Sequence, residues 1–117
     1  EGMPAGFLKH GTLSMVEPAL HSLFFVPPPE EKELHDRTLI AMEQVKTRGG
    51  TAIALMFQGD KRAHAVVDQS IELPPVSILL APLMQMIVAQ MFSYYAALEL
   101  GRNIDKPRNL AKSVTVG

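Results

Sequence analysis

The fold of this chain is decided by residues 21–57, which read HSLFFVPPPEEKELHDRTLIAMEQVKTRGGTAIALMF. The two ends of this stretch, residues 21–26 and 51–57, are short apolar runs bounded by proline or glycine, so they predict two buried strands. Residues 30–48 between them predict an amphipathic helix with acids in its first turn, bases near its end, and Gly49-Gly50 as its stop. A strand, a helix and a strand in this order predict a parallel sheet in an α/β fold.

The predicted helix has one apolar face, which we expect to pack on the sheet: Leu34, Ala41, Met42 and Val45. His35 is then expected to be exposed on this helix. His21 is expected at the edge of the first strand.

The rest of the chain continues the α/β pattern. Residues 1–12 are punctuated by glycine and proline and predict a loop, and residues 58–62 predict a polar turn. Residues 70–73 predict a third strand, closed by two prolines.

A long uncharged stretch, residues 73–98, follows the third strand. Pro82 suits the first turn of a helix that runs to Leu100 and stops at Gly101. Interruptions by polar residues and the lack of strongly basic flanks favour a helix buried on more than one side over a membrane span. Methionines on this helix are expected in the core: Met84, Met86 and Met91.

Composition excludes several classes of protein. With 117 residues, 47% of them hydrophobic and 20% charged, the chain can form a core of one domain or less. A net charge of −1 speaks against a general nucleic-acid binder. The absence of cysteine excludes a disulfide framework and thiolate metal sites, which fits a cytoplasmic protein. Because parallel sheets need helices on both faces, so few elements also suggest that more chain or another subunit supplies cover.

Two segments carry candidate chemistry. Residues 5–11, AGFLKHG, place a histidine between two glycines, where backbone can approach a ligand and an imidazole can move a proton; on its own, such a histidine is more often a surface residue. Residues 102–117, RNIDKPRNLAKSVTVG, hold four basic residues against one acid, and charge alone favours a solvated tail.

Both segments resemble the isomerase half of the glutamine–fructose-6-phosphate aminotransferases. The tail resembles the C-terminal signature of this family, and residues 5–11 resemble its Ala-Gly-Glu-Leu-Lys-His-Gly motif, with Phe7 in place of the acidic residue. The resemblance implies an α/β, SIS-type (sugar isomerase) flavodoxin-like three-layer sandwich with a parallel sheet, incomplete at its N-terminal side. Residues 1–101 would be the later part of that SIS domain, and residues 102–117 a tail that closes the active site.

The resemblance also implies roles for individual residues. Lys112 would be the catalytic lysine that opens fructose 6-phosphate through an imine, and His10 would assist ring opening and reach the active site of a neighbouring subunit. Lys9 and Gly11 would contact the substrate. Arg108 and Asn109 would anchor the tail.

The implied protein converts fructose 6-phosphate and glutamine-derived ammonia to glucosamine 6-phosphate, in the cytoplasm, as a homodimer, without metal or redox cofactor, nucleic acid or membrane. It needs upstream SIS and glutaminase regions, including the glutamate that moves the proton, so these 117 residues alone are expected to be inactive. The alternatives are a stand-alone SIS phosphosugar isomerase or deglycase, a non-catalytic phosphosugar-sensing SIS module, and a membrane-anchored fragment.

Overall fold

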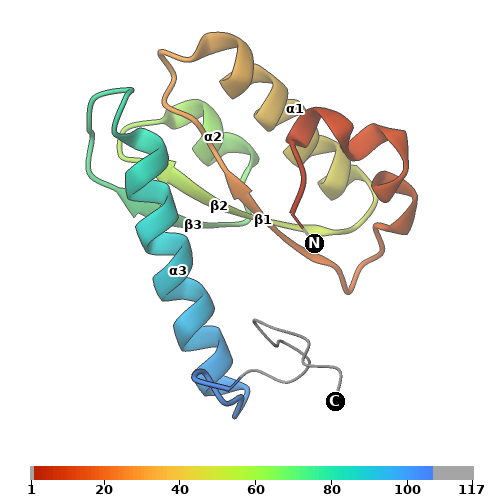
Figure 1. Ribbon diagram of the computed structural model, residues 1–117. Helices are drawn as coiled ribbons and strands as arrows, with labels where there is room; N and C mark the ends of the chain where they lie inside the picture. Colours follow the sequence, from red (N-terminus) through yellow and green to blue (C-terminus); the bar gives the residue numbers. More distant parts are fainter. Residues whose placement is uncertain (1, 107–117) are drawn as a thin grey trace, which may run out of the picture. The chain divides into compact units, whose positions relative to one another are not determined.

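The computed structural model describes residues 2–106 and divides them between two compact units that meet at residues 85 and 86. The first unit holds a three-stranded parallel sheet in the order β1-β2-β3, with β1 at His21–Phe25, β2 at Thr51–Phe57 and β3 at Gln69–Leu73 (Figure 1). Phe25 pairs with Leu55, and Phe57 pairs with Leu73, at the carboxyl ends of the strands. The parallel sheet and its strands are therefore as the sequence predicted.

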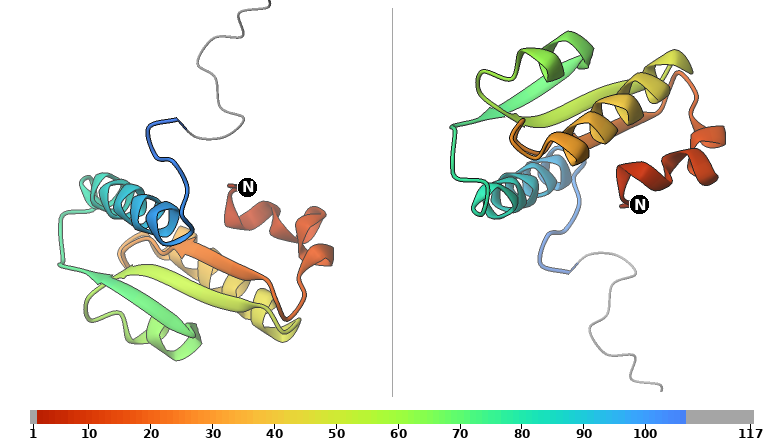
Figure 2. Two further views of the ribbon diagram at one scale, coloured as in Figure 1. Left: turned by 90° about the horizontal axis from the view of Figure 1, so that it is seen from below. Right: turned by 90° about the horizontal axis from the view of Figure 1, so that it is seen from above.

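Two helices cover one face of this sheet (Figure 2). They are α1, Lys32–Thr47, and the short α2, Lys61–Val66. The small residues Ala52 and Ala54 of β2 let α1 approach, and Leu39 and Met42 of α1 bury themselves there. A helix at residues 30–48 is thus confirmed, except that it begins at Lys32, after the prolines. Helix α2 was not predicted: the sequence indicated a polar turn at residues 58–62 and then a strand at residues 70–73.

Two side chains of α1 differ from the prediction. Leu34 is 55% exposed, whereas His35 is completely buried. The buried face is formed by His35, Leu39, Met42 and Val45, which recur at the helical period. Leu34 would share a face with Ala41, but the segment that covers Ala41 does not extend back to the first turn of the helix.

That covering segment consists of two short 3-10 helices: η1, Ala5–His10, where a loop was predicted, and η2, Thr12–Met15, which begins at the last residue of that predicted loop. Both lie beside α1 (Figure 1). Leu8 and Leu13 pack with Ala41 and Val45 in a second buried cluster. The N-terminal segment is therefore fastened beside α1, where Phe24 of β1 also packs.

The last helix, α3, runs over Ala81–Glu99 and begins in the first unit. Its bounds confirm the predicted helix with Pro82 in its first turn. The prediction that it is buried on several sides is wrong for this chain, since only Ala81 and Gln85 are buried and Met86 and Met91 are about half exposed. Within residues 2–106, no helix combines the length and apolar character needed to span a bilayer.

Candidate functional site

The predicted site residues Lys9, His10 and Gly11 form the turn in which η1 ends at His10 and Gly11 leads into η2. Leu8 on one side of this turn and Leu13 on the other are both buried. The carbonyl oxygen of Gly11 accepts two hydrogen bonds from Ser14, from its backbone N–H at 3.0 Å and from its hydroxyl at 2.6 Å. The buried leucines thus hold the turn at both ends, and the bonds from Ser14 fix the carbonyl of Gly11.

The structure shows what surrounds two of these residues. Lys9 is exposed, so its ammonium group can meet a ligand in solvent. A Cβ placed on Gly11 would find no atom within 4 Å. Packing therefore leaves open space beside Gly11. His10 is the last residue of η1.

The other predicted site residues, Arg108, Asn109 and Lys112, lie outside the described residues. Neither their contacts nor a meeting of the tail with the Lys9–Gly11 turn is part of the structure. The assignment of all six site residues stays a prediction.

At the end of α1 the backbone of Gly49 and Gly50 lies close to the segment that leads from η2 into β1. A Cβ on Gly50 would lie 2.7 Å from Cγ1 of Val16 and 2.8 Å from Cγ1 of Val45, which is too close for any side chain. Gly49 has a φ of +84° and lies against Pro18. The two glycines therefore end α1 and also let the chain between η2 and β1 pack across that end.

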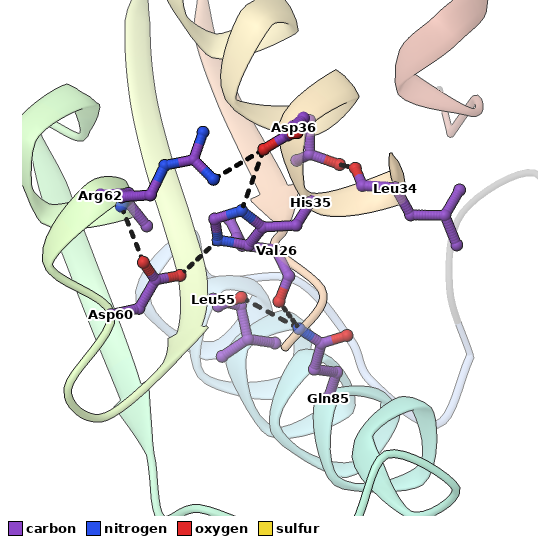
Figure 3. A network of polar contacts seen from close by, with 10 residues as sticks. Val26, Leu34, His35, Asp36, Leu55, Asp60, Arg62 and Gln85 are labelled. Atoms are coloured by element: carbon purple, nitrogen blue, oxygen red, sulfur yellow. Dashed lines mark hydrogen bonds and ion pairs between the residues drawn. The ribbon is translucent and has the colours of Figure 1, made fainter. Parts of the chain in front are cut away.

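A buried polar pair, which the sequence did not reveal, joins α1 to the turn after β2 (Figure 3). The side chains of His35 and Asp60 are 0% and 3% exposed, and His35 Nε2 lies 2.6 Å from Asp60 Oδ2. The other carboxylate oxygen of Asp60 accepts from the backbone N–H of Ala63 at 3.0 Å and so caps α2. Asp60 thus caps the start of α2 and also binds His35 of α1.

A more exposed pair continues this network toward solvent. Arg62 donates to Asp36 Oδ1 at 2.7 Å, and the same oxygen lies 4.0 Å from His35 Nδ1. Nδ1 is buried and has no hydrogen-bond partner among the described residues. The hydrogen bond from Arg62 holds the pKa of the Asp36 carboxyl below its usual value, because it favours the charged form.

Gln85 binds the carboxyl ends of two strands in the same region (Figure 3). Its buried Nε2 donates to the carbonyl of Val26 at 2.7 Å and to that of Leu55 at 3.1 Å. A polar residue in an otherwise apolar stretch is thereby explained, because it gives the carbonyl of Val26 a donor and adds a second bond to that of Leu55, which already accepts from the N–H of Val26 at 3.0 Å.

The opposite end of the sheet has its own polar junction. Asp68 accepts from the backbone N–H of Ala52 at 2.8 Å and pairs with Lys46 Nζ at 2.9 Å. The hydrogen bond from Ala52, followed by that from Lys46, lowers the pKa of Asp68 from its ordinary value. This junction fixes where β2 and β3 begin.

These networks are structural in character. His35, Asp60 and Gln85 are buried and bonded to other elements, so they join strands and helices rather than face a ligand. Within residues 2–106, no three acidic or histidine side chains are grouped so that they could hold a metal ion. At the turn Lys9–Gly11, by contrast, the exposed Lys9 follows the buried Leu8.

Comparison with known proteins places the chain among curated relatives. No family model matches it. The isomerising glutamine–fructose-6-phosphate aminotransferase of Clostridium tetani is 40% identical over 116 residues, 99% of this chain and 19% of that protein. The corresponding proteins of Mycobacterium tuberculosis and Thermus thermophilus are 41% and 37% identical over the same shares. The chain therefore spans about a fifth of the length of the curated relatives it matches.

A solved structure gives the same result. The C-terminal domain of glucosamine-fructose-6-phosphate aminotransferase from Francisella tularensis matches with a TM-score of 0.78 and 32% identity, over 92% of this chain and 30% of that one. The chain is thus related to the C-terminal part of the isomerising glutamine–fructose-6-phosphate aminotransferases, which confirms the resemblance seen in its sequence. Its α/β fold with a parallel sheet is consistent with an incomplete flavodoxin-like sandwich.

Proposed function

We propose that this chain is the C-terminal part of the isomerase half of a glutamine–fructose-6-phosphate aminotransferase, an enzyme that makes glucosamine 6-phosphate from fructose 6-phosphate and glutamine-derived ammonia. The observation that carries the proposal is the turn Lys9–Gly11. Buried Leu8 and Leu13 hold it on α1, while Lys9 is exposed and Gly11 leaves open space beside it. A fixed backbone with open space and a cationic side chain suits a phosphosugar.

The proposed roles of the two segments, and of His10 and Lys112, follow the family resemblance. Residues 1–101 would form the later part of an SIS domain and residues 102–117 a tail that closes its site. His10 would assist opening of the sugar ring. The amine of Lys112 would add to the sugar carbonyl and release water, forming an imine whose hydrolysis returns the amine. A lysine does this in its neutral form, which partial desolvation favours.

The remaining residues would bind and not react. Lys9 and Gly11 would contact the substrate, and Arg108 and Asn109 would anchor the tail. The proposal includes a cytoplasmic homodimer in which His10 serves the neighbouring subunit. It requires no metal or redox cofactor.

The 117 residues by themselves should not interconvert fructose 6-phosphate and glucose 6-phosphate. The resemblance assigns the glutamate that moves the proton to the part of the domain upstream of these 117 residues. Loss of such a general base costs about 10²- to 10⁴-fold in rate. Turnover by the isolated chain at the rate of a whole relative would contradict this.

The test is a chimera in which this chain replaces the aligned segment of the Clostridium tetani relative, assayed for glucosamine 6-phosphate. Lys112→Ala should lower kcat at least about 100-fold, as loss of a covalent catalyst does. Lys106→Ala, which removes another tail lysine, should leave kcat unchanged. His10→Gln should lower it by about 10²-fold, and His21→Gln, at an exposed strand end, should not.

Two results would overturn the proposal. One is an active chimera in which Lys112→Ala and His10→Gln turn over normally. The other is a chimera that binds fructose 6-phosphate without turnover and keeps that binding in Lys112→Ala, which would favour a sensing module.

A further inference from the structure

The carbonyl of Gly11 is held by a residue outside the family motif at residues 5–11. Ser14 donates to it twice, from its backbone N–H at 3.0 Å and from its hydroxyl at 2.6 Å. Any residue except proline could supply the first bond, whereas the second needs a hydroxyl at this position. The side chain of Ser14 therefore adds a contact that the backbone of η2 does not make by itself.

This contact acts at a point that side-chain packing does not fix. Gly11 has no side chain, and an added Cβ would meet no atom within 4 Å. Glycine also has more backbone freedom than any other residue, so its conformation depends on the bonds that its peptide groups make. Because a peptide group is planar, a bond that fixes the carbonyl oxygen of Gly11 also fixes the plane that joins Gly11 to Thr12.

Burial of the segment does not depend on the hydroxyl. Ser14 is exposed, and the segment is fastened to α1 by the side chains of Leu8 and Leu13. Replacing Ser14 with alanine would keep both leucines and the backbone N–H that donates to Gly11. The expected consequence is a turn that changes shape more often, on a segment that stays in place.

The size of the effect follows from the strength of the bond. A neutral hydrogen bond contributes a net free energy that corresponds to roughly 2- to 10-fold in an equilibrium constant. The apparent affinity for a ligand falls in proportion to the fraction of molecules whose turn has the binding shape. Because glycine gives the turn many other shapes, we expect loss of the hydroxyl to weaken binding about 2- to 10-fold, the upper limit being the strength of the bond.

We propose that Ser14 is a positioning residue for the turn Lys9–Gly11: its hydroxyl holds the carbonyl of Gly11 and so keeps the turn in the shape that contacts the phosphosugar. The inference rests on the proposed function, in which Lys9 and Gly11 contact the substrate. Ser14 itself touches no reacting atom. A turn that is ordered beforehand does not have to be ordered when the substrate binds, and this lowers the cost of binding.

The test uses the active chimera that carries this whole chain. Ser14→Ala should raise KM for fructose 6-phosphate about 2- to 10-fold and change kcat less than about twofold, because saturating substrate selects the turn in its binding shape. Ser14→Thr should keep KM within about twofold of the native value, since threonine offers the same hydroxyl. Ser93→Ala is the matched control: it removes an exposed hydroxyl that donates to the carbonyl of Ala89 at 2.9 Å within α3, and it should leave KM unchanged.

A double substitution tests whether Ser14 acts through the turn. Lys9→Met removes the cationic contact and should raise KM by itself. Adding Ser14→Ala to Lys9→Met should raise KM by a smaller factor than Ser14→Ala does alone, because part of what the turn presents to the substrate has already been lost. Independent effects that multiply in KM would place Ser14 outside the substrate site and overturn the inference.

The melting temperature separates positioning from stability. Because both leucines stay buried, Ser14→Ala should shift the melting temperature of the chimera by less than about 2 °C. A fall in melting temperature together with a loss of kcat would make Ser14 a stabilising residue and overturn the inference. If Lys9→Met raises KM and Ser14→Ala does not, the positioning role is wrong and the proposed function stands. If Lys9→Met keeps the native KM, the assignment of Lys9 to the substrate falls and the positioning role falls with it.

Discussion

Replacing Asp60 with alanine should destabilise the chain more than any exposed substitution. The carboxylate has one oxygen 2.6 Å from His35 Nε2 and the other 3.0 Å from the N–H of Ala63. His35 is completely buried and its other ring nitrogen already lacks a hydrogen-bond partner among the described residues. Asp60→Ala would therefore leave a buried imidazole without any partner and a helix without its cap.

The two losses have different sizes. Removing a helix cap costs about 1 kcal/mol, and removing one partner of a buried charged or strongly polar pair costs about 3 kcal/mol or more. Asp60→Ala should then lower the free energy of unfolding by about 4 kcal/mol, a large share of the roughly 5–15 kcal/mol of an ordinary domain. Asp60→Asn should cost only about 1 kcal/mol. Its oxygen can still cap α2, and its NH₂ can donate to Nε2 once the ring proton moves to Nδ1, on the side of Asp36.

The assay is urea unfolding followed by far-ultraviolet circular dichroism, with equal m-values required for comparison. The control is Glu33→Ala, which breaks the pair with Arg37 at the same 2.6 Å separation but with side chains 76% and 63% exposed. That pair should contribute roughly 0.5 kcal/mol or less. The reasoning is refuted if Asp60→Ala costs less than about 1 kcal/mol, or if asparagine is as damaging as alanine. Additive effects of His35→Leu and Asp60→Ala would also refute it, because partners in contact should couple.

Three further substitutions test the other junctions. Because the pKa of Asp68 is lowered, its carboxylate stabilises the fold above the ordinary pKa of 3.8 and loses this effect as the pH falls below it. The difference in free energy of unfolding between the native chain and Asp68→Asn should therefore shrink below about pH 4 in urea titrations. A difference that stays constant from about pH 6 to about pH 2.5 would contradict this. Gly50→Ala should cost about 2 kcal/mol by overpacking, and adding Val16→Ala should recover part of that loss in the same assay, whereas no recovery would remove the steric explanation. Gln85→Leu leaves the buried carbonyl of Val26 without its donor, whereas that of Leu55 keeps the N–H of Val26, and the change should cost about 2 kcal/mol; an unchanged thermal midpoint would show that the carbonyl of Val26 finds another partner.

The sheet and the long helices could be predicted because burial imposes a period on the sequence. β2 is apolar on both faces and bounded by Gly50 and Gln58, so its limits were readable without the structure. The stop of α3 at Gly101 was readable as well, because a left-handed backbone there favours glycine. An element can be predicted from sequence when burial requires apolar residues in it or when its backbone conformation requires a particular residue such as glycine.

His35 shows why the same reasoning failed for the buried network. The helical period places residues 35, 39, 42 and 45 on the sheet-facing side, but a polarity rule assigned that side to Leu34 and left His35 in solvent. Burial of His35 depends on Asp60, which lies 25 residues away, and no local pattern reports such a partner. The signal that could have found α2 is Asp60 itself, three residues before Ala63, in a helix-capping position.

The two 3-10 helices were missed for a related reason. Residues 1–12 are punctuated by glycine and proline and have no apolar period, so their propensity predicts a loop. Contacts made by Leu8 and Leu13 with α1 order the segment nonetheless. Short elements of this kind are stabilised by tertiary packing, which outweighs local propensity.

Gly50 and Gly11, both in the first unit, differ in whether packing leaves room for a side chain. At Gly50 a side chain would collide with Val16 and Val45, so packing alone accounts for the glycine. At Gly11 packing does not demand one, because nothing lies within 4 Å of an added Cβ. Gly11 thus has open space beside it and follows the exposed Lys9 on a segment that buried leucines hold in place. This space would allow a ligand to approach closely, and the proposed function therefore assigns substrate contacts to Lys9 and Gly11 and not to the buried His35–Asp60 pair.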